Sequence, residues 1–244
     1  MESYSDFAYL YDTLTRDVEY EKRADYIQQL ISRHTDINVE LIADIGCGTG
    51  TMCNILSQRG YDMIGIDGSD SMLNVAKEKS SDDILYLNQR MTEFELYGTV
   101  DVILSMLDCV NYLTEDGEVE EFFALAHNYL NHEGLFIFDI NSVYKFENIL
   151  SDNIYNYEDD NVFYSWENSY DGEICEFYLN FFVQGDDDTY QRITEQHFER
   201  AYDTAYIKNA LEQAGFEVVG IYGDLGFDSP ADDEQRIFFV AKKQ

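Results

Sequence analysis

The chain has 244 residues, with 49 Asp and Glu against 15 Lys and Arg, which gives a formal net charge of −34. A surface this acidic repels phosphate backbones and anionic lipid headgroups, so the composition argues against nucleic acid or a membrane surface as a partner. No basic segment with an apolar run opens the chain and no apolar run approaches about 18 residues, so we expect a cytoplasmic protein without a membrane span.

The four cysteines form no C-x-x-C pair and have no histidine at ligand spacing. We interpret Cys47, Cys53, Cys109 and Cys175 as reduced thiols, and we expect no metal site.

Four aromatic residues precede the first helical pattern, namely Tyr4, Phe7, Tyr9 and Tyr11. They have no core stripe of their own, so we expect residues 1–15 to form a lid over a bound ligand. The apolar positions between Tyr20 and Ile31 then recur with the period of a helix.

Residues 44–50 read Asp-Ile-Gly-Cys-Gly-Thr-Gly. They directly follow the apolar run 41–43, overlap the end of a predicted strand over 39–45 and precede a predicted helix. Alternate glycines allow positive φ and leave room for a ligand at the positive end of the next helix. We therefore expect ligand contacts at Gly46, Cys47, Gly48 and Gly50. The dinucleotide pattern G-x-G-x-x-G has its third glycine one position later. Asp44 would oppose a pyrophosphate but suits a ligand with an ammonium or sulfonium group.

Asp67 follows the β-rich run 61–66 and lies 21 residues after Gly46. A carboxylate at the end of the second strand of a doubly wound sheet can accept both hydroxyls of a ribose. Together with Asp44 it favours an adenosine-type ligand with a charged tail that carries no phosphate. S-adenosylmethionine meets this description, and a nicotinamide cofactor on an unusual glycine loop is the alternative.

With these residues the chain resembles the class I S-adenosylmethionine-dependent methyltransferases over almost its whole length. Residues 68–73 are similar to the family segment in which a methionine packs on the adenine, which implies contacts from Gly68 and Met72. Residues 107–113 are similar to the segment that borders the transferred methyl, which implies roles for the residues Asp108, Asn111 and Tyr112.

The opening residues 7–12 resemble a bacterial subgroup of small-molecule methyltransferases, in which an N-terminal segment covers the cofactor, and this implies a role for Tyr11. One position departs from the family. The segment after the third strand usually carries an acidic residue near the adenine amino group, and this chain has Arg90 there. Gln89 or a backbone carbonyl is then expected to make the adenine contact.

The order of the predicted elements indicates the fold class. Strands over 63–66, 84–87, 100–105 and 135–140 alternate with helical segments, and a helix over 204–214 and strands over 217–222 and 236–241 follow. This alternation predicts an α/β, doubly wound (Rossmann-like), mostly parallel sheet with the ligand at the C-terminal strand ends. The resemblance implies seven strands, the last two in an antiparallel hairpin, in a domain made of residues 1–150 and 203–244.

Residues 151–202 break the alternation of helix and strand. Period-2 runs over 162–170, 174–183 and 190–202 predict an inserted three-stranded antiparallel sheet. Odd-numbered residues from Cys175 to Val183 form an apolar face, which we expect to pack over the main domain. In the family such insertions shape the acceptor pocket, so we expect substrate contacts from Trp166 and Tyr178.

Methyl transfer is an in-line displacement, and orientation of the acceptor can supply on the order of 7–11 kcal/mol. A general base is needed only if the acceptor must lose a proton. The catalytic candidates are Asp108, Tyr11 and His197, and the substrate-contact candidates are Asn111, Tyr112, Trp166 and Tyr178. Each has a structural alternative: the tyrosines as packing residues, His197 on the solvent face of its strand, and Asp108 as a cap of the next turn.

The sequence thus predicts a methyltransferase that uses S-adenosylmethionine and acts on N or O of a small molecule. Between Phe146 and Gln191 there are twelve acidic residues and no Lys or Arg, which indicates either an amine acceptor or carboxylates that only solvate an exposed sheet. Three other functions stay open: a non-catalytic protein that binds S-adenosylmethionine or S-adenosylhomocysteine, a nicotinamide enzyme, and a tRNA methyltransferase. A homodimer also stays open.

Overall fold

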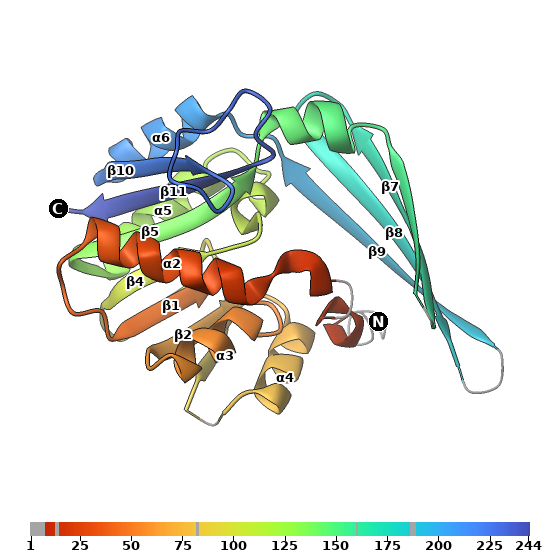
Figure 1. Cartoon of the computed structure of the whole chain (residues 1–244), viewed down its shortest axis with the longest axis horizontal. Helices are drawn as coiled ribbons and strands as arrows, with labels where there is room; N and C mark the ends of the chain where they lie inside the picture. Colours follow the sequence, from red (N-terminus) through yellow and green to blue (C-terminus); the bar gives the residue numbers. More distant parts are fainter. Residues whose placement is uncertain (1–7, 13–14, 82, 160, 186–188) are drawn as a thin grey trace.

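Two β-sheets organise the chain, a seven-stranded sheet and a four-stranded sheet (Figure 1). The computed structural model describes residues 8–12, 15–81, 83–159, 161–185 and 189–244. The larger sheet has the order β10-β11-β5-β4-β1-β2-β3, with β11 antiparallel to both of its neighbours. The mostly parallel, doubly wound fold predicted from the sequence is therefore confirmed.

The strands of the large sheet are β1 (Leu41–Ile45), β2 (Asp62–Asp67), β3 (Leu85–Asn88), β4 (Val100–Ser105), β5 (Leu130–Asn141), β10 (Phe216–Gly223) and β11 (Arg236–Lys243). The α-helices are α2 (Tyr20–His34), α3 (Thr51–Gln58), α4 (Asp70–Lys79), α5 (Glu118–Tyr129) and α6 (Thr204–Gln213). Short helical turns η1 (Arg16–Val18) and η2 (Cys109–Tyr112) and the π-helix η3 (Lys145–Leu150) complete the connections.

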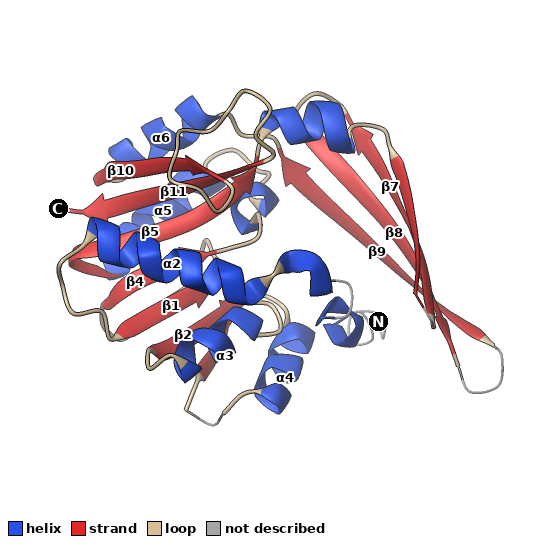
Figure 2. Cartoon of the chain, viewed as in Figure 1, coloured by secondary structure: helices blue, strands red, loops and turns tan. Residues whose placement is uncertain are grey.

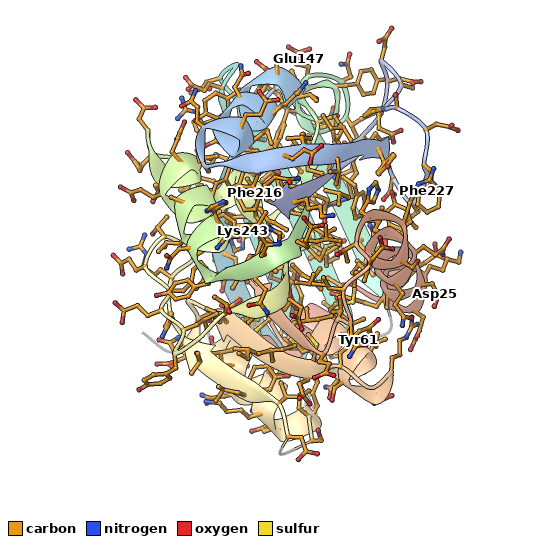
Figure 3. The ribbon with its side chains drawn as sticks, turned by 90° about the vertical axis from the view of Figure 1, so that its left-hand side faces the viewer. Asp25, Tyr61, Glu147, Phe216, Phe227 and Lys243 are labelled. Atoms are coloured by element: carbon orange, nitrogen blue, oxygen red, sulfur yellow. The ribbon has the colours of Figure 1, made fainter. Side chains whose placement is uncertain are left out.

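The helices cover both faces of this sheet (Figure 2). One face packs against α2, α3 and α4, and the other against α5 and α6. The central strands are therefore buried on both sides and are almost continuously apolar, as parallel strands between two helical layers must be. In the side view of Figure 3, Phe227 lies near α2, and Phe216 lies toward the opposite face.

The inserted sheet has four antiparallel strands, where the sequence predicted three: β6 (Ile154–Asp159), β7 (Val162–Tyr170), β8 (Ile174–Gln184) and β9 (Tyr190–Arg200). The strand missed is β6, an exposed edge strand whose mixed tyrosine and acidic residues read as a loop. Tyr155 and Tyr157 hold it by packing on Trp166 and Tyr164 of β7.

The insertion leaves the main domain after β5 through η3 and returns to it ahead of α6 (Figure 1). The apolar face predicted on β8 is turned inward, where Cys175 and Phe177 pack with Phe146 and Leu150 of η3, and Phe181 packs near Tyr11. Within the part of the chain described here, no helix has both the length and the apolarity of a membrane span.

Candidate active site

A cavity of about 440 Å³ lies at the C-terminal ends of the parallel strands. Loops that follow β1, β2, β3 and β4 line it, together with one residue of the N-terminal segment and one of the inserted sheet. Predicted site residues in its lining are Tyr11, Gly46, Gly48, Asp67, Gly68, Met72, Gln89, Arg90, Asp108, Tyr112 and His197.

The three glycines of the loop after β1 all have positive φ, +80° at Gly46, +53° at Gly48 and +72° at Gly50. A Cβ on Gly46 would lie 2.6 Å from Sγ of Cys109, and one on Gly50 would lie 2.3 Å from the hydroxyl of Tyr86. Around Gly48 the nearest atom would be 4.0 Å away, in the ring of Tyr11. Gly48 therefore leaves open space for a ligand, whereas Gly50 lies outside the cavity lining and is required by packing.

Asp67 joins the glycine loop to the loop after β2. Its Oδ2 accepts a hydrogen bond from the backbone N–H of Gly48 at 2.9 Å, and its Oδ1 accepts one from Ser69 at 2.8 Å. Burial raises the pKa of Asp67, and the two N–H donors counteract that shift. Each oxygen keeps a second lone pair, so the carboxylate can still accept two ligand hydroxyls.

Asp44 lies beneath the glycine loop, beside a small cavity of about 40 Å³ that Cys47 and Gly48 also line. Its side chain is only 2% exposed, and Sγ of Cys53 donates to its Oδ2 at 3.4 Å. Burial raises the pKa of Asp44 to about 7. A cationic group placed in this small cavity would favour the ionised carboxylate.

Gln89 and Arg90 lie where the sequence predicted the adenine contact. Oε1 of Gln89 already accepts a hydrogen bond from the backbone N–H of Glu95 at 2.8 Å, so only its amide NH₂ is available to a ligand. Met72 also lines this cavity, in the first turn of α4. The resemblance assigned it the adenine face, and its position in the lining is compatible with that prediction.

A second cavity, of about 380 Å³, lies between the strand ends and the inner face of the inserted sheet. It shares the residues Tyr11, Leu107, Asp108, Tyr112 and His197 with the first cavity. One wall is aromatic and aliphatic, with Tyr164, Trp166, Phe177, Leu179 and Phe181. The polar part of the lining carries Asp17, Asp108, Asn141, Lys145, Glu199 and Arg236.

The backbone turn between the two cavities is strained. Leu107 and Asp108 have φ values of +59° and +58°, which side chains rarely adopt. The carboxylate of Asp139, at the end of β5, holds this turn by accepting the N–H of Leu107 at 2.8 Å and that of Asp108 at 3.1 Å. Such strain persists at functional sites only where the surroundings over-determine it.

Arg236, the first residue of β11, completes this arrangement by bonding both Asp139 and Oδ1 of Asp108, the latter at 2.5 Å. Burial would raise the pKa of Asp108, but Arg236 and Lys145 outweigh it and lower that pKa. Asp108 is therefore an ionised, oriented carboxylate rather than a cap of the next turn. Sequence reasoning missed Asp139 and Arg236, which belong to strands distant along the chain.

His197 lines both cavities from β9, and its ring packs edge-on against that of Tyr112 at 5.9 Å between centroids. Its inward direction excludes the solvent-face alternative. Burial lowers the pKa of His197, which keeps the imidazole neutral near pH 7. A neutral imidazole can accept a proton from a group held in either cavity.

Three expectations for the acceptor side are corrected. Asn111 is fully buried and bonds the backbone of Asn141 and Arg200, so it is a structural residue outside both cavities. Tyr178 points to the outer face of β8, where Arg192 reaches its hydroxyl, because residues alternate sides along a strand. None of the described acidic residues of 147–188 lines either cavity.

The comparisons with known proteins agree with this geometry. A family model described as a methyltransferase domain matches residues 42–134. A Geobacillus sp. (strain WCH70) protein that bears a provisional methyltransferase name is 34% identical over 99% of this chain and 100% of its own length. An S-adenosylmethionine-dependent methyltransferase from Clostridium acetobutylicum ATCC 824 has a TM-score of 0.89 at 30% identity, over 98% of both chains. This chain belongs to the class I S-adenosylmethionine-dependent methyltransferases.

The sugar N-methyltransferase of Streptoalloteichus sp. ATCC 53650 has a TM-score of 0.82 at 16% identity, over 97% of this chain and 92% of its own, which shows a shared fold. S-adenosylmethionine is the cofactor of this methyltransferase, and the nicotinamide alternative is set aside. The open space at Gly48 and the remaining lone pairs of Asp67 fit an adenosine, and the buried carboxyl of Asp44 fits a cationic tail.

Proposed function

We propose that this methyltransferase moves the methyl group to a nitrogen or oxygen of a small molecule held in the second cavity. The observation that supports this most directly is the position of that cavity, which adjoins the cofactor cavity at Tyr11, Asp108, Tyr112 and His197. Its volume of about 380 Å³ lies in the usual range of small-molecule sites. The charge of −34 argues against a tRNA acceptor.

In this proposal the chain orients the acceptor and removes its proton. Bound S-adenosylmethionine supplies the methyl group on a sulfonium with a neutral thioether leaving group. The acceptor lone pair forms the new bond as the C–S bond breaks, and the proton that the acceptor loses passes to the neutral imidazole of His197. Asp108, fixed by Arg236 at 2.5 Å, orients the acceptor by accepting a hydrogen bond from it.

Release of S-adenosylhomocysteine in the presence of fractionated metabolite pools tests the proposal and identifies the acceptor. His197→Gln should lower kcat by about 10² or more while the affinity for S-adenosylhomocysteine stays the same. The matched control is His132→Gln, since the His132 side chain is 76% exposed and lies away from the site.

With saturating S-adenosylmethionine at every pH, the wild-type rate should fall only below the ordinary histidine value of 6.5, because burial lowers the pKa of His197 and only the neutral ring accepts a proton. Full activity of His197→Gln would refute its role. Cofactor binding without turnover on any pool would favour the non-catalytic alternative.

A further inference from the structure

We propose that the polar part of the second cavity's lining binds an anionic oxygen group of the acceptor, a carboxylate or a phosphate, with Lys145 as its ligand. This inference rests on the proposed function, because it concerns the molecule that the second cavity holds. It replaces the expectation of an amine acceptor. That expectation depended on the acidic residues between Phe146 and Gln191, and none of those that the structure describes lines the cavity.

Lys145 begins the π-helix η3, which connects β5 to the insertion. Helices of this kind are rare and occur mostly at functional sites. The lysine side chain lines the second cavity, and its Nζ donates to Oδ1 of Asn141 at 2.8 Å. In the described part of the chain, no carboxylate oxygen lies within 4.0 Å of this nitrogen, the distance that defines an ion pair.

Besides Lys145, the charged side chains of this lining are Asp17, Asp108, Glu199 and Arg236, and the last three are engaged with other groups of the protein. Arg236 is paired with Asp108 and Asp139, so its charge is compensated within the protein. Glu199 accepts a hydrogen bond from Nδ2 of Asn141 at 2.8 Å, and burial raises the pKa of its carboxyl well above the usual range. Lys145 is thus the cation of the described lining whose charge a ligand can still compensate.

An anion bound at Lys145 would relieve two unfavourable effects. Burial, the largest cause, and the neighbouring Arg236 lower the pKa of Lys145, because they disfavour its charged form, and together they outweigh Asp108, Glu199 and Asp139, which raise it. The ammonium also has three donors, and one is used by Asn141. The aromatic wall around Trp166 and Phe177 then faces the rest of the ligand. The acceptor class is therefore a small anion with an apolar or planar body.

The chain contains one tryptophan, and that residue, Trp166, lines this cavity. Its fluorescence can report occupancy when the protein, saturated with S-adenosylhomocysteine, is titrated with probes that share an aromatic body. Benzoate and phenyl phosphate carry the anion, benzamide is neutral and benzylamine is cationic. We expect at least one of the two anions to bind about tenfold or more tightly than benzamide, and the tighter of the two identifies carboxylate or phosphate.

Lys145→Met should abolish that preference, with the affinity for the anion reduced about tenfold or more and the affinity for benzamide within about twofold of wild type. Lys208→Met, on the exposed surface of α6, should behave as wild type. Unchanged affinity of both variants for S-adenosylhomocysteine checks their folding. Tightest binding of benzylamine, or an anion affinity that Lys145→Met leaves unchanged, would overturn the inference. The screen for S-adenosylhomocysteine release tests the proposed function separately, because it depends on no probe.

Discussion

At the scale of single residues, we expect Asp67 to contribute to cofactor binding, because it ties the glycine loop to the loop after β2 and still has lone pairs for a ribose. Asp67→Ala should weaken binding of S-adenosylhomocysteine by about 2–4 kcal/mol, the cost of losing charge-assisted hydrogen bonds. Isothermal titration measures the loss. Asp62→Ala, at the exposed start of the same strand, is the control. Equal affinities of the two variants would remove Asp67 from the ligand site.

Asp44 should make cofactor binding depend on pH. Its pKa of about 7 without ligand means that the carboxyl is largely protonated below neutrality. A raised pKa stabilises the ligand-free protein at low pH, and that stabilisation is lost as the pH rises from the unfolded value of 3.8 through 7.

A ligand ammonium needs the ionised form of Asp44, so the affinity for S-adenosylhomocysteine should fall by up to about tenfold per pH unit below pH 7. Titrations from pH 5.5 to 8 in wild type and Asp44→Asn measure this effect, and the variant should show a flat profile. The same slope in both proteins would assign the dependence to another group.

The residues that line the first cavity were largely predictable, because most of them follow one another along the chain, from the glycine loop to Gln89. Asp139, Lys145 and Arg236 were not, because each is a lone charged residue whose partners come from other elements. The prediction for Tyr178 was wrong because its two neighbours along β8, Phe177 and Leu179, line the cavity instead. A period-2 pattern predicts which residues share a face, but the face that turns inward depends on how the whole sheet is placed.

At the scale of elements, a network of hydroxyls and one ion pair fastens the N-terminal segment to the main domain. Asp12 accepts from the hydroxyl of Thr49 and from Nζ of Lys79, both at 2.5 Å, and Lys79 also donates to Thr51 at 2.8 Å. The neighbouring Tyr11 lines both large cavities. The position of residues 8–12 is compatible with the predicted lid, and residues 1–7, with Tyr4 and Phe7, lie outside the described ranges.

Lys79→Met should loosen this attachment and release S-adenosylhomocysteine about 2- to 10-fold faster, since a partly exposed ion pair of this kind contributes about 1 kcal/mol. Stopped-flow displacement measures the rate. Lys77→Met, on the exposed side of the same helix, controls for the loss of one positive charge. Equal dissociation rates for the two variants would contradict a closing role of the segment.

The strands were predicted with one omission. Helix α2 and strand β4 have strong apolar periodicity, and the glycine loop marks the end of β1, so the sequence located all three. Strand β6 lacks such a signal, because on an exposed edge its only requirement is backbone pairing with β7. The packing of the β8 face over the strand ends was expected, and the cavity that it leaves there depends on side-chain shape.

At the scale of the whole molecule, the charge of −34 should make stability depend on salt. Like charges repel one another more strongly in the compact state than in the unfolded chain, and the Debye length falls to about 10 Å at 0.1 M salt. The melting temperature should therefore rise with sodium chloride from low ionic strength to about 0.3 M. Differential scanning fluorimetry measures it, with sucrose at matched osmolality as the control. A melting temperature that falls with salt would show that attractive pairs dominate instead.

The amide side chain of Asn111 bonds to both ends of the insertion, where the chain leaves the main domain and where it returns. Its Oδ1 accepts the N–H of Asn141 at 2.9 Å, near the end of β5, and its Nδ2 donates to the carbonyl of Arg200 at 2.8 Å, at the end of β9. An insertion whose two ends lie next to each other can be replaced without a change in the topology of the main domain. Evolution could therefore give this methyltransferase a new acceptor by replacing residues 142–200, if the new segment brings its own proton acceptor in place of His197, and a chimaera that keeps Asn111 offers the same route to protein engineering.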